Sequence, residues 1–165
     1  MAARQILTAA LLLVVTLASA CSDDGPERER VVIDGRTFEL DYAVDDETRQ
    51  RGLGGRAEIS EDGGMIFVFP DPEFQAFWMY DCLVDIDIIY LDARGTITAV
   101  HRMKAEPQRG PDDSDRDYEA RLPRYPSVYP AQFAIELRSG WLDRLDLSVD
   151  DRIELDLDRL KAMAR

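Results

Sequence analysis

The stretch that most constrains the fold is residues 63–92, which read GGMIFVFPDPEFQAFWMYDCLVDIDIIYLD. Residues 65–69 form an apolar run closed by Pro70, and residues 86–91 are rich in β-branched and aromatic side chains. Short runs of this composition predict strands that are buried on at least one face. Between them lies the hexamer FWMYDC at 77–82, which places an acid and a thiol beside a large apolar surface and is the first place to look for a site.

The residues before this stretch predict a hairpin followed by a short helix. Asp34-Gly35 separates residues 31–33 from residues 37–43, and this dipeptide favours the two-residue turn of a β-hairpin. Asp45 can then cap a helix over residues 46–53, which has acids in its first turn and arginines in its last. The glycine-rich sequence that follows, GLGGR, predicts the end of this helix.

The rest of the chain predicts more short strands. Residues 86–92 and 96–103 are joined by a short glycine-containing connection, which indicates an antiparallel hairpin. Residues 104–130 hold five prolines and clustered acids, which predict a long exposed loop. Further strands are expected at 75–79, 132–137 and 152–157, with a helical turn at 139–145 and a frayed helical tail at 158–165.

Together these elements predict one mainly β domain over residues 31–157. We expect a compact antiparallel β-sandwich or partly open barrel of about seven to eight short strands, with one or two short helices. The chain has no alternating βα pattern and no internal repeat.

The N-terminus carries export signals. Arg4, an apolar run at 6–17 and small residues before position 21 predict a signal peptide over residues 1–20. The string LASAC resembles the lipobox of bacterial lipoproteins and predicts acylation of Cys21, which would anchor the protein to a membrane of the bacterial cell envelope. The alternative is an ordinary secretory signal with an incidental cysteine. Residues 21–30 then form the lipidated cysteine and a charged, flexible tether.

The charge balance limits the partners. The chain has 33 acidic and 20 basic residues and a formal net charge of −13 at pH 7. Such a surface repels nucleic acid, so no nucleic-acid partner is expected, and it suits cations, basic proteins or neutral ligands. If Cys21 carries lipid, Cys82 has no intramolecular partner and the domain has no disulfide framework.

The motif order resembles the domain of unknown function 192 family, also called UPF0127. The residues that carry this resemblance are RGLGGR, GGMIFVFP, FWMYDCLVDIDIIYLD, FAIELRSGW and VDDRIEL, in that order. The family's central string usually runs Phe-Trp-Met-Lys-Asn-Thr, so Phe77, Trp78 and Met79 match while Tyr80 and Asp81 depart from it. Because tyrosine and aspartate stand where the family has lysine and asparagine, the site is less cationic here. The resemblance implies a compact β-sandwich-like fold and supplies no reaction.

Trp78 is the best candidate for contact with a ligand. In an alternating strand, Phe77 and Met79 point one way and Trp78 and Tyr80 the other, so one pair can fill the core while the other lines a concave face. Aromatic platforms of this kind stack on sugar rings or apolar ligands, and nearby acids set the orientation. The alternative is that Trp78 is a core residue.

Two catalytic or metal interpretations are weaker. Cys82 with His101 has the residue types of a thiol nucleophile and its base, but the acids around Cys82 would raise the pKa of the thiol. Asp81, Asp85 and Asp87, or the acids at 112–115, could hold a hard cation, although neither spacing matches an EF-hand loop. The alternative is that both groups of acids are simply in contact with solvent.

Arg56 and Glu136 are single charges in otherwise apolar motifs, and one possibility is an ion pair that ties the helix end to the strand at 132–137.

The function favoured by the sequence is a non-enzymatic, lipid-anchored module that binds a small molecule, a glycan or an envelope protein, without a cofactor or metal. The alternatives are an enzyme of unknown reaction centred on Cys82 or on the three aspartates, and a purely structural accessory domain. The predicted ligand-binding residues are Trp78, Tyr80, Asp81, Cys82, Asp87 and Arg56, and the predicted lipidation site is Cys21.

Overall fold

The computed structural model describes residues 28–165. The predicted signal peptide, the lipidated Cys21 and most of the predicted tether lie outside the described residues. The first strand begins at Glu29, two residues earlier than expected. No helix within the described part of the chain is long and apolar enough to cross a membrane.

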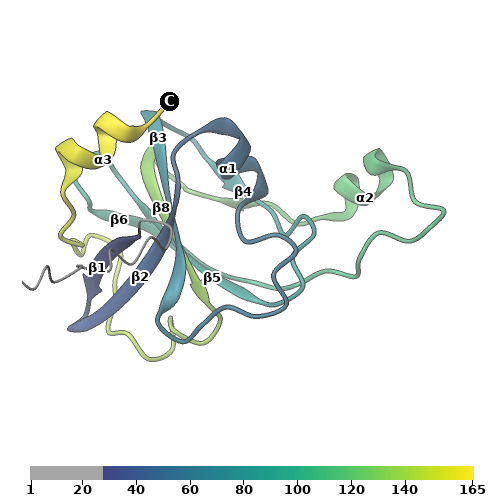
Figure 1. Cartoon of the computed structure of the whole chain (residues 1–165), viewed down its shortest axis with the longest axis horizontal. Coiled ribbons are helices and arrows are strands. Elements are labelled where there is room, and N and C mark those ends of the chain that lie inside the picture. The colour runs from purple at the N-terminus through teal and green to yellow at the C-terminus, as the bar shows by residue number, and fades with distance from the viewer. Residues whose placement is uncertain (1–27) are drawn as a thin grey trace, which may run out of the picture.

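A mixed six-stranded sheet forms the centre of the domain (Figure 1). Its strands lie in the order β1-β2-β3-β8-β5-β6, and a second, two-stranded sheet pairs β4 with β7. The strands are β1 Glu29–Ile33, β2 Arg36–Ala43, β3 Gly63–Glu73, β4 Ala76–Phe77, β5 Ile86–Leu91, β6 Ile97–Met103, β7 Tyr125–Pro126 and β8 Ala131–Arg138.

The prediction of a mainly β domain is confirmed. Residues 28–165 form eight strands and three short helices: α1 Asp46–Arg51, α2 Asp115–Arg121 and α3 Leu157–Met163. The expectation that every pairing is antiparallel is wrong at one place, because β2 and β3 run parallel. A parallel neighbour cannot be reached by a tight turn, and the crossover that joins these two strands contains α1.

Both predicted hairpins are present. Asp34 and Gly35 have positive φ angles of 47° and 71°, as the favoured two-residue turn between β1 and β2 requires. β5 and β6 pair antiparallel through the short connection that ends at Gly95, where φ is 82°.

The sheet has an apolar core on each face. One core, which we call the closed face, is covered by the segment after β8 and by α3, and includes Phe38, Ile89, Phe133, Trp141 and Leu160. The opposite core, the α1 face, includes Leu53, Phe67, Met79, Cys82 and Tyr90. All six residues of β5 are buried, because this strand has a core on both sides.

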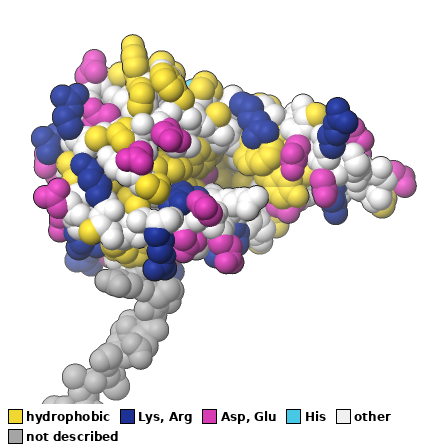
Figure 2. Space-filling model, turned by 90° about the horizontal axis from the view of Figure 1, so that it is seen from above, with side chains coloured by type: hydrophobic (Ala, Val, Ile, Leu, Met, Phe, Trp, Pro, Cys, Tyr) yellow, Lys and Arg dark blue, Asp and Glu magenta, His cyan; other side chains and the backbone are white. Residues whose placement is uncertain are grey.

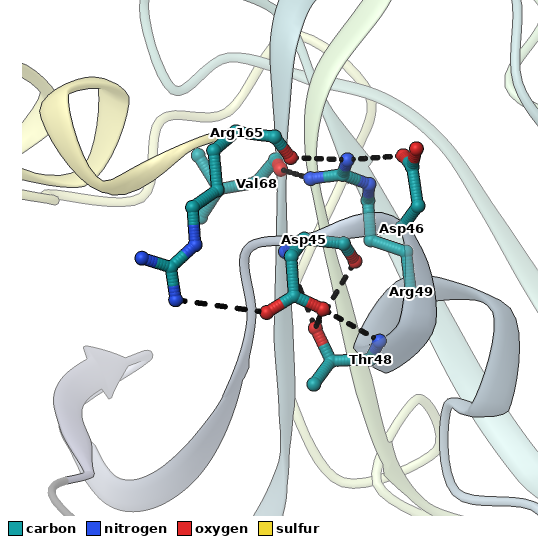
Figure 3. A network of polar contacts seen from close by, with 6 residues as sticks. All are labelled: Asp45, Asp46, Thr48, Arg49, Val68 and Arg165. Atoms are coloured by element: carbon teal, nitrogen blue, oxygen red, sulfur yellow. Dashed lines mark hydrogen bonds and ion pairs between the residues drawn. The ribbon is translucent and has the colours of Figure 1, made fainter.

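Helix α1 is short and is held by its ends. Asp45 accepts a hydrogen bond from the backbone N–H of Thr48, and the Thr48 side chain closes a capping box. Arg49 donates to the carbonyl of Val68 on β3 at 2.9 Å and to the backbone carbonyl of Arg165 at 2.8 Å (Figure 3). These contacts fix α1 over one face of the sheet, since one side chain joins the helix to a strand and to the C-terminus.

Three predicted elements differ from the structure. The strand expected at 75–79 is reduced to Ala76–Phe77. In the strand expected at 152–157, a single bridge joins Arg152 to Thr96. The expected frayed tail is the ordered helix α3, which begins at Leu157 and buries Leu160 completely.

The loop expected at 104–130 extends from the body as an arm and carries α2 near its tip (Figure 1). Ser114 caps α2, and Tyr118 on this helix is fully buried. Two-residue β7 returns the arm to the body by pairing with β4. We refer to residues 104–130 as the arm.

Candidate functional site

A cavity of about 240 Å³ lies between α1 and the sheet, on the α1 face. We call it the inner cavity. Asp46, Arg49 and Gln50 of α1 line it together with Gly52 and Leu53 from the end of the helix. Aromatic and other apolar side chains of β3, of β4 and of the segment after it supply most of the wall: Phe67, Phe69, Phe77, Trp78, Tyr80 and Cys82. Glu136 of β8, Gln75 and Ala76 complete the lining.

A second cavity of about 530 Å³, the outer cavity, lies between the body and the arm. It shares Gln50, Trp78 and Tyr80 with the inner cavity, so these side chains form a common wall. Gln108 and Glu119 line it from the arm. Figure 2 shows hydrophobic side chains gathered in the hollow where the arm joins the body.

Glu136 is the most unusual residue of the inner cavity. It lies in the middle of β8 and is 4% exposed, and its Oε2 atom has no hydrogen-bond partner within residues 28–165. Burial raises the pKa of this carboxyl to about 8, against the lowering effects of a backbone hydrogen bond from Leu53 and of the charge on Arg56. At neutral pH Glu136 is therefore mostly a neutral acid with an unused polar atom.

Cys82 also lines the inner cavity, and its thiol is buried. Burial, followed by the charges of Glu136 and Asp81, raises its pKa to about 12. Its Sγ atom donates to the carbonyl of Tyr80 at 3.5 Å. A thiolate is the nucleophilic form of cysteine, so Cys82 is poorly suited to attack a substrate at neutral pH.

Trp78 and Tyr80 are half-buried and form the wall between the two cavities. Their rings lie 5.5 Å apart at 36°. The guanidinium carbon of Arg124, on the arm, lies 3.5 Å from the centre of the Trp78 ring, a cation–π arrangement. The predicted division of the hexamer holds in part: Met79 is fully buried, but Phe77 lines the inner cavity together with Trp78.

The arm is fastened to the residues that form this wall. The backbone N–H of Asp81 donates to the hydroxyl of Tyr118 at 3.0 Å, and the rings of Tyr80 and Tyr118 lie 5.2 Å apart. Gln108 donates to the carbonyl of Cys82 at 3.0 Å. The arm thus supports the cavity wall as well as lining the outer cavity.

The structure brings four of the six predicted ligand-binding residues together. Trp78, Tyr80 and Cys82 line the inner cavity, and Asp81 lines the outer cavity with Trp78 and Tyr80. The motif GLGGR meets the hexamer here, because the N–H of Gly55 donates to the carbonyl of Asp81 at 2.8 Å.

The other two predicted residues line neither cavity. Arg56 pairs with Asp41 at 2.7 Å. The ion pair considered between Arg56 and Glu136 is therefore wrong, since Asp41 takes the guanidinium and Glu136 stays buried without it. Asp87 lies on the closed face, where its Oδ2 accepts the N–H groups of Gly140 and Leu142, each at 2.9 Å.

The acids considered as a metal site are dispersed. Asp85 accepts from Lys104 at 2.7 Å and from the N–H of Ala105 at 2.9 Å, while Asp87 caps the turn after β8. Residues 28–165 contain no group of three or more His, Cys, Asp or Glu side chains arranged to hold a metal ion. His101 shares a 2.8 Å hydrogen bond with the carbonyl of Pro126 and packs on Tyr125.

The role of Glu136 at the cavity was not predicted from the sequence. Its signal was present, because a glutamate in the middle of the apolar run FAIEL is unusual in a strand that is buried on both faces. Phe67 and Phe69 were predicted as strand residues, and only the position of α1 makes them cavity walls.

Fold and site together define a β domain with an aromatic cavity built around a buried acid. A family model described as "Uncharacterized ACR, COG1430" (DUF192) matches residues 29–155, and the chain belongs to this family. The resemblance stated from the motifs is confirmed. A search of curated proteins found no match.

Two solved structures share the fold. A protein from Sinorhizobium meliloti 1021, provisionally described as a transcription regulator, is 30% identical in sequence. That match covers 76% of this chain and 89% of the other, with a TM-score of 0.59. A protein of unknown function from Novosphingobium aromaticivorans DSM 12444 is 20% identical, with coverage of 76% and 82% and a TM-score of 0.58. The second likeness concerns the fold alone.

Proposed function

We propose that this domain is a non-enzymatic binding module whose inner cavity takes a small, largely apolar molecule with one polar group. The observation that carries the proposal is the Oε2 atom of Glu136, which is buried, lines the cavity and lacks a hydrogen-bond partner among the described residues. Leaving a buried polar group unpaired costs on the order of 1–3 kcal/mol. A ligand that hydrogen-bonds to Glu136 would remove that cost.

The composition of the wall supports the same proposal. Ligand sites are concave and mostly apolar, with a few convergent polar groups. The inner cavity has five aromatic residues and one buried acid, and the aromatic rings contact each other edge to face, as Phe67 and Phe77 do at 4.7 Å and 80°. Its volume suits a small ligand.

The lipid anchor remains part of the proposal. Acylation of Cys21 would hold the domain at a membrane of the bacterial cell envelope. DNA binding, which the provisional description of the S. meliloti protein would suggest, is not favoured because the formal net charge of this chain is −13. Cys21→Ala should abolish lipidation and membrane fractionation; a variant still found in membranes would contradict the anchor.

A thermal-shift screen of small molecules on the full-length protein tests the binding proposal. A ligand at 100 times its dissociation constant adds about 2.7 kcal/mol to the folded state, which moves the melting temperature by several degrees. Trp78→Ala should abolish the shift, because Trp78 lines both cavities.

Phe74→Ala is the matched control, since Phe74 is an aromatic residue that is 74% exposed and lines neither cavity. Its variant should keep the shift. Hits that survive Trp78→Ala and Glu136→Gln alike would place the binding elsewhere and contradict the proposal.

A further inference from the structure

We propose that the ligand of the inner cavity is an organic cation, a protonated primary amine, whose ammonium group binds Glu136 while its hydrocarbon part contacts the aromatic wall. This inference rests on the proposed function and adds the chemical class of the ligand.

The charges near Glu136 leave it without a countercharge. Arg56 is engaged by Asp41 at 2.7 Å. Arg49, the arginine that lines the inner cavity, donates to Asp46 at 2.7 Å and to two backbone carbonyls. An ammonium ion would give Glu136 both the hydrogen bond that Oε2 lacks and the opposite charge that a buried carboxylate needs.

The wall suits a cation as well as an apolar group. Aromatic rings attract cations through their electron-rich faces. Trp78 already holds the guanidinium of Arg124 at 3.5 Å, which shows that a cation is accommodated against this wall. Phe67, Phe77 and Tyr80 provide further ring surface inside the cavity.

The approach to the site is negatively charged overall. Asp46 lines the inner cavity, and Glu47, Asp81 and Glu119 line the outer one, against Arg49, Arg51 and the guanidinium of Arg124 on the Trp78 ring. With a formal net charge of −13, the whole chain attracts cations and repels anions.

Binding of an amine should release a proton. At neutral pH Glu136 is mostly protonated, because burial raises its pKa to about 8. An ammonium ion stabilises the ionised carboxylate, so its binding should displace about one proton per ligand at pH 7. The other groups that act on Glu136 or are affected by it are Arg56, Cys82 and Tyr90; Cys82 and Tyr90 stay protonated at this pH because their own pKa values are raised.

The test compares two probes of the same size, benzylamine and benzyl alcohol, by titration calorimetry on the full-length protein. Both can donate a hydrogen bond, but only the amine is charged. Repeating the titrations in two buffers of different ionisation enthalpy measures the protons released. We expect benzylamine to bind about tenfold tighter or more and to release about one proton, while the alcohol releases none.

Glu136→Gln should remove both the preference for the amine and the proton release. Asp87→Asn is the matched control, because it also removes a buried carboxyl but from the closed face. This control should keep the preference, and its melting curve shows whether it is folded.

The other outcomes separate the cationic ligand from the binding module. Equal or tighter binding of benzyl alcohol that is lost in Trp78→Ala overturns the cation and keeps the binding module. Amine binding that survives Glu136→Gln unchanged also overturns the inference, because it reports general attraction to an acidic surface. If neither probe binds, the inference is overturned, and the thermal-shift screen with Trp78→Ala decides the binding module separately.

Discussion

Asp87 and Glu136 are buried carboxyl groups on the neighbouring strands β5 and β8, and they lie on opposite faces of the sheet with different partners. Asp87, on the closed face, gives one oxygen to the N–H groups of Gly140 and Leu142 and serves as the cap of a turn. Glu136, on the α1 face, receives a backbone hydrogen bond from Leu53, has an unpaired second oxygen and lines a cavity. Asp87 also has one unpaired oxygen among the described residues, but it lines neither cavity.

The difference lies in what covers each face. The closed face is covered by the segment after β8, whose Trp141 donates to the carbonyl of Glu61 at 2.7 Å and packs edge to face on Phe38. The α1 face is covered by a six-residue helix that has no buried residue of its own. A short helix held by its ends can bridge a hollow without filling it, and this leaves the space beside Glu136.

The largest expected effect is the dependence of stability on pH. Because the pKa of Glu136 is raised from 4.5 to about 8, the folded protein keeps a proton that the unfolded chain loses above pH 4.5. The free energy of unfolding should therefore fall between pH 4.5 and 8, by on the order of 4 kcal/mol. Urea unfolding at several pH values measures this.

Glu136→Gln should flatten this pH dependence, since an amide does not titrate. If the free energy of unfolding of the variant falls by the same amount, another group causes the fall. The contrast between Glu136 and Asp87 would then fail.

A second effect should appear on the closed face. Asp87→Ala removes the acceptor of two buried N–H groups, those of Gly140 and Leu142, and should lower the free energy of unfolding by about 3 kcal/mol. Glu136→Gln should change it by less than about 1 kcal/mol near pH 4, where the glutamate is largely neutral in the folded and the unfolded chain, and should raise it at pH 7, where unfolding lets the glutamate ionise. Chemical denaturation of both variants makes the comparison, and equal losses would contradict it.

A third, smaller effect concerns Gly52, where φ is +52°. A Cβ atom there would lie 3.4 Å from the Phe67 ring and 3.6 Å from Oε2 of Glu136, so Gly52→Ala should fill space in front of the acid. We expect a stability loss of about 1 kcal/mol and at least tenfold weaker binding of a cavity ligand.

Gly140→Ala is the control for backbone strain. Gly140 also has a positive φ, 97°, and an added Cβ would meet nothing within 4 Å. Its variant should lose about the same stability and keep the ligand; weaker binding in both variants would show that strain, not the filled space, is responsible.

The smallest effect is expected at Cys82. Because its thiol is buried and its pKa is raised to about 12, Cys82→Ala should leave ligand binding within about twofold and cost on the order of 1 kcal/mol of stability. Calorimetry on the variant measures binding. Rapid alkylation of the native thiol at pH 7 would instead favour the thiol-enzyme alternative.

The sequence predicts the local parts of this fold well and the site only in part. The Asp34-Gly35 hairpin and the Asp45 cap depend on residues next to each other in the chain, so local patterns identify them. The parallel pairing of β2 with β3 and the place of α1 over Glu136 depend on contacts between distant segments. Trp78 and Tyr80 could be predicted as a ligand wall, but nothing local distinguishes the capping role of Asp87 from the cavity role of Glu136.

Titration of Glu136 followed by carboxyl ¹³C NMR measures directly whether this buried acid is protonated at neutral pH. Glu136→Gln assigns its signal. We expect a midpoint near pH 8, caused by burial of the carboxyl beside the inner cavity without a countercharge. A midpoint below about pH 5 would mean that Glu136 is paired or solvated as an ordinary carboxylate, and it would contradict the claim that the α1 face holds a buried, protonated acid.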